Sequence, residues 1–446
     1  MPRPPKGRSR AEERRRLEDE AARVEVGDSC DVCVLGAGAA GLAAAIASAE
    51  AGASTVALER GLSCGQKILA TGNGRCNLSN RDLDFSRYND PAFVAEAAGA
   101  RFGEDVVSLM EGSGLIVAEE DGRLYPLSRQ AASVRDVLLA RARRAGALLA
   151  PGREVTRVER CGQGLRVRYA LACGEGGTAR ERSIYARCVV VALGGGTPLP
   201  ALLGRGLGLE ARPWEPVLCP IACSGAGRLL GELDGRRVHV SALLVRGGSE
   251  VAREAGEVIF RPYGVTGIVA FDLSRRCRPN DALVLDLAPG HSVTELRRAA
   301  GAAGQARGRG PAREAGRATQ AAAARLHGFL DLRIASALAR EAASGLAGAP
   351  TEEAVLERAL ALAKGLALAV EGPAEPKRAQ VSRGGLVLAQ FSPRTLACRS
   401  VPGLFAAGES LDVDADCGGF NLAWAWKSGM VAGAAAAERA LSRTGA

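Results

Sequence analysis

The chain has 446 residues, 47% of them hydrophobic and 24% charged, with a formal net charge of +9. This length exceeds what one compact core usually holds, so two or three domains are expected. The twelve cysteines are scattered through apparent core strands and loops. Their placement excludes a disulfide framework and fits a reducing cytoplasm.

The two ends of the chain show no targeting or membrane signal. Residues 1–29 alternate charges from Arg10 to Arg23 and lack the apolar core of a signal peptide. We interpret them as a charged tail, either disordered or a short surface helix. The apolar stretch near Val431–Ala437 is too short to span a bilayer, and charged residues flank it.

The first ordered segment reads as a strand–helix–strand unit. Asp31–Leu35 is a short apolar run typical of a buried parallel strand, and Gly36–Gly41 is a glycine-rich turn. Leu42–Ala51 is an alanine-rich helix, and Ser54–Leu58 is the second strand. This context gives the G-x-G-x-x-G pattern the meaning of a dinucleotide fingerprint.

Each residue of this fingerprint has a physical role. Gly36 allows the tight turn, Gly38 lets the backbone approach a pyrophosphate, and Gly41 lets the helix pack on the strand. Glu59 follows the second strand, where its carboxylate can accept hydrogen bonds from ribose hydroxyls. The same carboxylate would repel a 2′-phosphate, which disfavours NADP at this site.

Residues 63–80 form a loop rich in glycine and asparagine. Three glycines frame Asn73, and Arg75 and Asn77 follow. Such a loop can bring backbone amides and a guanidinium against an anion. A turn-rich connection without a ligand explains the same composition, and the residues alone leave both readings open.

The rest of the first half alternates helices and short strands before a glycine stop. The expected elements are a helix at Pro91–Ser113, a hairpin at Gly114–Tyr125, a helix at Ala132–Ala145, and strands at Glu154–Arg160, Leu165–Ala172 and Ser183–Leu193, the last ending at Gly194–Gly196.

From about residue 200 the pattern changes to a second domain. Val217–Ile221, Val238–Val245 and Glu257–Phe260 are typical of antiparallel strands, and residues 291–370 of helices. Residues 295–325 carry seven arginines against Glu295 and Glu314. Clustered arginine suits nucleic acid, but no aromatic residue is interleaved for base stacking, so we favour a solvated surface.

A second glycine-rich segment lies near the C-terminus. Gly403–Glu409 reads as a strand that ends on a carboxylate, at the edge of an open α/β sheet where ligands bind. Gly418–Leu422 then opens a helix whose amino end could face a flavin and stabilise its reduced anion. Together with Gly36–Gly41, this segment predicts flavin adenine dinucleotide (FAD).

These motifs resemble those of the BaiN-like (YhiN-like) family of bacterial FAD flavoproteins. The resemblance spans nearly the whole chain and rests on Gly36–Gly41, Lys67–Asn77, Gly122–Pro126, Tyr263–Gly267, Gly408–Asp412 and Asp416–Leu422. It implies bound FAD and an NAD(P)/FAD-dependent oxidoreductase. In a minority of members the named activity is reduction of a conjugated C=C bond in a bile-acid 3-oxo intermediate. The chain departs from the family at Arg383, where a small residue is usual.

The predicted fold is α/β: a discontinuous Rossmann-like FAD-binding domain with an inserted antiparallel β-rich domain and a small helical subdomain. Its expected parts are a tail at 1–29, the FAD-binding domain at 30–200 and 377–446, the β-rich domain at 201–290 and 345–376, and the helical subdomain at 291–344.

We expect hydride transfer from NAD(P)H through the flavin to an electron-poor acceptor such as an enone. No second complete glycine fingerprint is present, so the nicotinamide is expected to dock transiently. No metal is expected, and the catalytic residues stay unassigned, with Tyr125, Tyr263 and Cys76 as candidate proton donors. The alternatives are an FAD-dependent RNA-modifying or RNA-binding protein and a non-catalytic FAD-binding protein.

The expected FAD-binding residues come from both glycine segments, the loop at 63–80 and two strand ends. They are Gly36, Gly38, Ala39, Ala40, Gly41, Glu59, Arg60, Lys67, Thr71, Gly72, Gly74, Arg75, Cys76, Asn77, Val155, Gly194, Gly408, Glu409, Gly418, Gly419, Phe420, Asn421 and Leu422.

Overall fold

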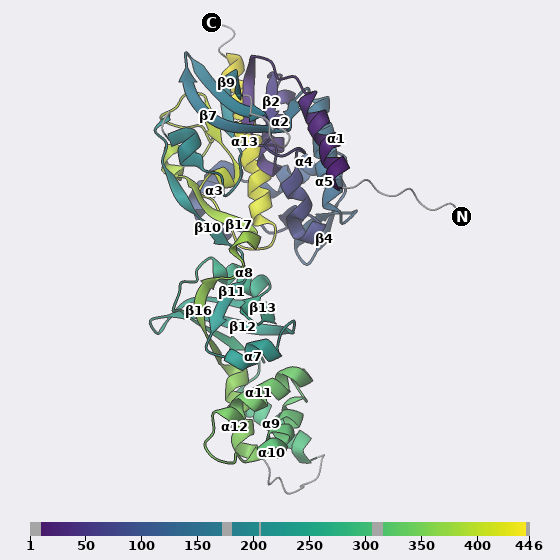
Figure 1. The fold of residues 1–446 in the computed structure, drawn as a ribbon, viewed down its shortest axis with the longest axis vertical. Coiled ribbons are helices and arrows are strands. Elements are labelled where there is room, and N and C mark those ends of the chain that lie inside the picture. Colours follow the sequence, from purple (N-terminus) through teal and green to yellow (C-terminus); the bar gives the residue numbers. More distant parts are fainter. Residues whose placement is uncertain (1–9, 172–180, 205–206, 306–314, 443–446) are drawn as a thin grey trace, which may run out of the picture. The chain divides into compact units, whose positions relative to one another are not determined.

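The computed structural model describes residues 10–171, 181–204, 207–305 and 315–442. They form two compact units, one of Met1–Glu215 with Val381–Ala446 and one of Pro216–Gln380 (Figure 1). The first unit is built from two separate stretches of chain, in agreement with the predicted discontinuous α/β fold. It extends past residue 200 because β10 (Ala211–Val217) pairs with β17 (Val381–Leu386).

A seven-stranded sheet forms the centre of the first unit. Strand β1 (Ser29–Leu35) lies between β2 (Thr55–Leu58) and the long β9 (Glu181–Val191), parallel to both. Strand β18 (Leu404–Ala406) also runs parallel to β9, so the C-terminal segment joins the same sheet. The outer strands are β6 (Leu148–Ala150), β7 (Arg153–Cys161) and β8 (Gly164–Leu171).

Two helices from opposite ends of the chain pack closely in this unit. Helix α2 (Ala39–Glu50) follows the glycine turn, and α13 (Phe420–Ser442) follows the second glycine segment. A Cβ atom added at Gly429 would lie 2.3 Å from the carbonyl oxygen of Ala40, and one at Gly433 would lie 2.4 Å from that of Ala44. The two glycines therefore let the helix backbones touch.

Substituting Gly433 by alanine is expected to destabilise the first unit by about 2–3 kcal/mol, because backbone cannot yield as a side chain can. Gly103→Ala is the matched control, since its Cβ would meet only the Leu83 side chain at 3.8 Å. Urea denaturation of both variants measures the difference. Equal stability of the two variants would contradict the idea that Gly433 is needed for the close packing of α13 on α2.

The remaining elements of the first unit cover or extend the sheet. They are α5 (Ala131–Arg144), α3 (Pro91–Ala98), α4 (Phe102–Glu111), a small sheet of β3 (Ser79–Asn80), β4 (Val117–Glu120) and β5 (Arg123–Pro126), and the short turns η1 (Gln66–Gly74), η2 (Phe85–Arg87), η3 (Pro200–Gly204), η5 (Leu388–Gln390) and η6 (Gly408–Ser410).

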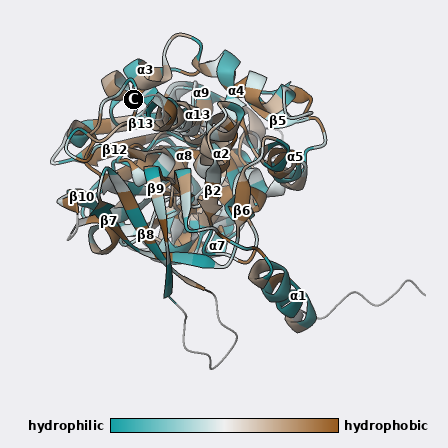
Figure 2. Cartoon of the chain, turned by 90° about the horizontal axis from the view of Figure 1, so that it is seen from above, coloured by the Kyte–Doolittle hydropathy of each residue, from teal (hydrophilic) through white to brown (hydrophobic). Residues whose placement is uncertain are grey.

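One local prediction needs correction. The single helix expected at Pro91–Ser113 is two helices, because Gly99 adopts a φ of +69° and ends α3. The charged N-terminal segment contains α1 (Arg10–Ala22), which is one of the two readings left open by the sequence and is mostly hydrophilic (Figure 2). The buried Arg153 fixes the end of this segment, since its guanidinium donates to the carbonyl oxygens of Ala21 and Val24 at 2.7 and 2.6 Å.

The second unit contains a closed antiparallel barrel. Its strands, in order around the barrel, are β11 (Ile221–Ser224), β14 (Gly264–Thr266), β13 (Ser249–Arg261), β12 (Arg237–Arg246), β15 (Ala282–Asp286) and β16 (Leu366–Pro373). The strand expected at Val217–Ile221 begins only at Ile221, and β16 replaces the end of the helical region predicted up to residue 370.

Helices accompany the barrel in this unit. They are α7 (Gly227–Glu232), α8 (Ile268–Ser274), α9 (Val293–Gln305), α10 (Ala315–Leu326), α11 (Leu332–Ser344), α12 (Glu352–Lys364) and the short η4 (Pro376–Arg378). In the described part of the arginine-rich stretch, Arg297 pairs with Glu357 at 2.6 Å and Arg325 with Glu352 at 3.0 Å. These two arginines hold α9 and α10 to α12, while residues 306–314 lie outside the described range.

No helix among the described residues combines the length and the apolar composition needed to cross a bilayer. Every described cysteine is free, and both Cys30 and Cys33 of β1 are buried.

Candidate functional site

The glycine turn is packed so closely that side chains are excluded at two positions. A Cβ atom at Gly41 would lie 1.9 Å from the carbonyl oxygen of Gly36, and one at Gly36, where φ is +93°, would lie 2.4 Å from that of Ala192. Gly38 differs, because its Cβ would meet nothing within 4 Å. Gly38 is also the N-cap of α2, and no side chain caps this helix.

The amino end of α2 is therefore suited to an anion. Ala39 and Ala40 occupy its first turn, where backbone N–H groups have no acceptor within the helix. Such N–H groups and the helix dipole favour negative charge, and phosphate in particular.

Glu59 is held beside this turn. One carboxylate oxygen accepts a hydrogen bond from the Ala37 N–H at 2.9 Å, and the other accepts from Gly61 at 2.7 Å. The carbonyl oxygen of Glu59 accepts from the Arg153 N–H at 2.7 Å, so β7 starts here, two residues before the buried Val155. Arg60 is exposed next to Glu59.

The second glycine segment reaches the first turn of α2. A Cβ added at Gly408 would lie 2.8 Å from the Cβ of Ala40. The Gly408 N–H donates to Ser428 Oγ at 2.9 Å, and the Trp424 indole N–H donates to the Gly408 carbonyl oxygen at 3.3 Å. Ser428 and Trp424 both belong to α13. The structure thus joins the two segments that the sequence separates by more than 360 residues.

Glu409 is the centre of a polar cluster at the ends of β9 and β18. Its Oε2 accepts from the Gly195 N–H at 3.0 Å and pairs with Lys67 Nζ at 3.1 Å. A Cβ at Gly194 would lie 3.6 Å from the same oxygen. The Lys67 side chain is 71% exposed, so it can move to a ligand without losing buried contacts.

The loop at 63–80 packs against Gly418 and Gly419. A Cβ at Gly419 would lie 2.4 Å from the Ser79 carbonyl oxygen and 2.9 Å from Asn77 Oδ1, and the Asn80 amide donates to the Gly418 carbonyl at 3.0 Å. Asn77 Oδ1 is buried and has no hydrogen-bond partner among the described residues. A buried acceptor without a donor is costly, so this oxygen fits a ligand that brings an N–H group.

These features fit FAD. Its diphosphate matches the uncapped turn of α2, its ribose hydroxyls match the carboxylate of Glu59, and the isoalloxazine N–H matches the orphaned oxygen of Asn77. The closely packed glycines at both segments leave no room for side chains in the same region.

The beginning of α13 is fixed by its own first residues. The Asn421 side chain accepts from the Ala415 N–H at 2.9 Å and donates to the Ala415 carbonyl at 2.8 Å, which closes the preceding loop. The Phe420 carbonyl accepts from the buried Tyr88 hydroxyl at 2.8 Å, and Leu422 is partly buried against the core.

Other predicted residues of the loop serve local structure. The Thr71 hydroxyl donates to the Ile68 carbonyl at 2.6 Å, and Gly72 has a φ of +55° where a Cβ would lie 2.7 Å from the Asn77 nitrogen. Gly74 adopts a φ of +85°. The Arg75 guanidinium pairs with Glu120 at 2.7 Å and lies 4.6 Å from the centre of the Tyr125 ring, so it is already occupied.

The candidate proton donors differ in their surroundings. Tyr125 is buried, and the guanidiniums of Arg75 and Arg129 lie 4.6 and 4.9 Å from the centre of its ring. Burial raises the pKa of the fully enclosed Cys76 thiol to about 11, so it stays protonated at neutral pH. Burial also raises the pKa of Tyr263, which lies in the second unit with its hydroxyl 3.5 Å from Glu375 Oε2.

One group of residues near this site was missed from the sequence. Asp412 and Asp414 are buried just after Glu409; Asp412 pairs with Arg212 at 2.7 Å, and Asp414 pairs with Arg383 at 2.9 and 3.0 Å. Burial raises the pKa of Asp412, and Arg212 opposes this effect. Alternation of aspartate with apolar residues from Leu411 to Asp416 was the available signal.

Comparison with known proteins places the chain in a family. The family model of the HI0933-like protein Rossmann domain matches residues 30–435. The chain belongs to this family. A 3-dehydro-bile acid delta(4,6)-reductase of Clostridium scindens is 30% identical over 426 residues, which cover 91% of this chain and 98% of the relative.

More distant relatives carry a different name. A ribosomal RNA dihydrouridine synthase of Haemophilus influenzae is 26% identical over 414 residues, 89% of this chain and 95% of that protein. The solved 3-ketosteroid-delta4-(5alpha)-dehydrogenase of Rhodococcus jostii RHA1 is a partial likeness, with a TM-score of 0.45 and 16% identity over 93% of this chain and 98% of that one. As a member of the HI0933-like family, the protein is an FAD-dependent oxidoreductase.

Proposed function

We propose that the protein transfers hydride from NAD(P)H, by way of FAD, to a C=C bond conjugated with a carbonyl group. The observation that supports the proposal is the close approach of Gly408 to Ala40, because it brings the two glycine segments together. Bound FAD supplies the two-electron chemistry, and the chain supplies binding and electrostatics.

The residues of the first segment hold the adenosine half of the cofactor in this proposal. The N–H groups of Ala39 and Ala40 bind the diphosphate, and Gly38 leaves space for it. Glu59 accepts hydrogen bonds from the ribose while its two backbone donors keep the carboxylate in place.

The residues of the second segment hold the flavin half. Glu409 accepts from the ribityl hydroxyls, and Lys67 balances its charge. Asn77 accepts from an N–H group of the ring system through its unpartnered oxygen. The amino end of α13, at Phe420–Leu422, favours negative charge on the part of the flavin that lies beside it.

The names of the two relatives support one class of acceptor. The Clostridium scindens protein is named for reduction at the 4,6 positions of a 3-dehydro bile acid. Dihydrouridine differs from uridine by reduction of a C=C bond that is conjugated with a ring carbonyl. Both substrates therefore present an electron-poor C=C bond, which is the type of group that accepts hydride.

Anaerobic mixing of the FAD-loaded protein with NADH or NADPH tests the donor. At least one of the two is expected to bleach the visible flavin band, and addition of a cyclic enone or dienone is expected to restore it. No bleaching with either donor would contradict the proposed reductase and favour a non-catalytic FAD-binding protein.

An RNA substrate is the second candidate, because a relative carries the name of a ribosomal RNA dihydrouridine synthase. Two described arginines of the 295–325 stretch, Arg297 and Arg325, do not add support, since they are paired with glutamates of α12. Incubating the reduced protein with ribosomal RNA and measuring dihydrouridine by mass spectrometry separates the candidates. Dihydrouridine formation without enone reduction would replace the small-molecule acceptor by RNA.

A further inference from the structure

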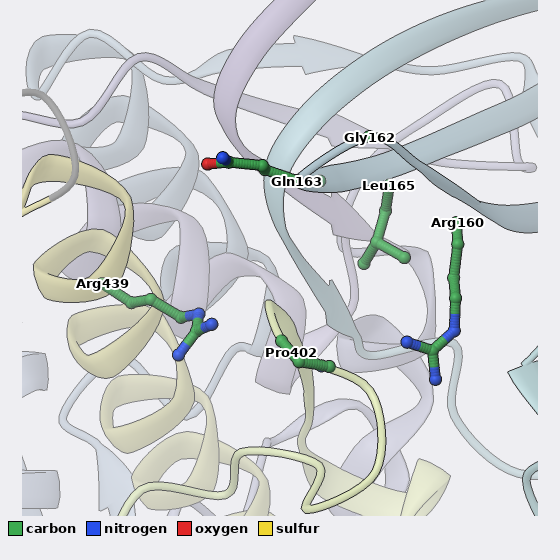
Figure 3. A pocket seen from close by; sticks show the side chains of 7 residues that line it. Arg160, Gly162, Gln163, Leu165, Pro402 and Arg439 are labelled. Carbon is green, nitrogen blue, oxygen red and sulfur yellow. The ribbon is translucent and has the colours of Figure 1, made fainter.

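A pocket lies in the first unit, away from the proposed cofactor site. It has a volume of about 320 Å³ and lies between the β7–β8 turn, the segment before β18 and the last turns of α13 (Figure 3). Leu165, which lines it, pairs with Ala186, and Ala186 pairs with Cys30 at the amino end of β1. The pocket therefore lies near the amino end of β1, whereas Gly36 follows the carboxyl end of that strand.

Two guanidiniums from different elements line this pocket. Arg160 projects from the end of β7 and Arg439 from α13, on either side of Pro402 (Figure 3). Arg160 is anchored, because its Nη2 donates to the Ser400 carbonyl oxygen at 2.8 Å. That bond fixes the guanidinium at the wall and leaves its other N–H groups for a ligand.

Arg439, unlike Arg160, has a buried side-chain N–H group without an acceptor among the described residues. This group is at Nε, and no carboxylate of the described residues forms an ion pair with Arg439. Arg187 of the same unit, in contrast, pairs with Asp31 at 3.5 Å. A buried N–H without an acceptor costs about 1–3 kcal/mol, so the site is incomplete without an anion or another acceptor.

The rest of the lining completes a small anion site. Among the described residues, no acidic side chain lines the pocket; Leu165 and Pro402 provide apolar surface, and the Gln163 amide lies at the turn (Figure 3). Two guanidiniums facing one space match an oxyanion, which accepts several charge-assisted hydrogen bonds at once.

We propose that this pocket binds a small oxyanion, the phosphate or carboxylate group of a metabolite, between Arg160 and Arg439. This site is separate from the proposed flavin site, because the two lie at opposite ends of the parallel strands. The proposal does not depend on the acceptor that the flavin reduces.

Isothermal titration calorimetry of the full chain tests the site. The titrations use inorganic phosphate in one arm and succinate in the other, with FAD in excess so that the dinucleotide site is filled. Saturable binding of at least one anion is expected, and Arg439→Gln and Arg160→Gln are each expected to weaken it about tenfold or more. The preferred anion distinguishes a phosphate-bearing from a carboxylate-bearing ligand.

Arg144→Gln is the matched control, because Arg144 is exposed on α5 and does not line the pocket. It is expected to bind as the unsubstituted protein does. Absence of saturable binding for both anions up to about 10 mM, a concentration that reveals even weak sites, would overturn the proposal. Binding that Arg439→Gln and Arg160→Gln leave unchanged would overturn it as well.

Discussion

Replacing Arg383 by alanine is expected to lower the free energy of unfolding of the first unit by about 3–5 kcal/mol. The Arg383 guanidinium donates two hydrogen bonds to the carboxylate of Asp414, at 2.9 and 3.0 Å, and the Asp414 side chain is 0% exposed. Without the guanidinium, a buried carboxylate loses its partner, which is more costly than the loss of an exposed ion pair. Urea denaturation measures the change.

Arg394→Ala is the control for this prediction. Arg394 pairs with Glu96 at 3.1 Å, but the two side chains are 82% and 49% exposed, so the loss is expected to be below about 1 kcal/mol. The double variant Arg383→Ala/Asp414→Ala is expected to recover part of the stability, since no unpaired charge is left. A double variant less stable than Arg383→Ala would contradict the pairing as the cause.

Substituting Gly38 by alanine is expected to weaken FAD binding by about 100-fold while lowering the stability of the FAD-free protein by no more than about 1 kcal/mol, the cost of alanine at an N-cap. A Cβ at Gly38 would meet no atom of the described residues within 4 Å, so it creates no clash with them. In the proposed site it occupies the space that the diphosphate needs, and a steric penalty of about 3 kcal/mol corresponds to this factor. Thermal unfolding and FAD titration provide the two readouts.

Gly41→Ala and Gly27→Ala are the comparison variants for this result. The Cβ at Gly41 would lie 1.9 Å from a backbone oxygen, so that variant is expected to lose stability as well as FAD affinity. The Cβ at Gly27 also meets nothing within 4 Å, and Gly27 lies outside the glycine turn, so both properties should be retained. Unchanged FAD affinity in Gly38→Ala would place the diphosphate elsewhere.

Local signals made the strand–helix–strand segment around the glycine turn predictable. The strand expected at Asp31–Leu35 is β1 at Ser29–Leu35, and the strand expected at Ser54–Leu58 is β2 at Thr55–Leu58. The glycine turn, the helix and both strands lie within 30 residues, so their pattern is contained in one short stretch of sequence. The strands β7, β8 and β9 were predictable for the same reason.

Long-range pairing explains what the sequence did not reveal. Arg212 and Asp412 are 200 residues apart, and nothing local to either residue indicates the other. The family departure at Arg383 becomes understandable only when Asp414 is seen beside it. Gly429 and Gly433 read as ordinary small residues of a helix until α2 is found against them.

Strand β16 shows a different limit. Its buried positions alternate from Leu366 through Leu368 to Val370, which is the period of a strand. Alanines occupy the exposed positions and continue the alanine-rich composition of α12, so the segment reads as helix. Closure of the barrel between β15 and β11 decides in favour of the strand.

Titration of the FAD-stripped full chain with FAD, followed by quenching of flavin fluorescence, tests whether Gly36–Gly41 and Gly408–Leu422 form one site, as the close approach of Gly408 to Ala40 indicates. Saturation at one FAD per chain is expected. Absence of saturable FAD binding by the folded chain would contradict such a site.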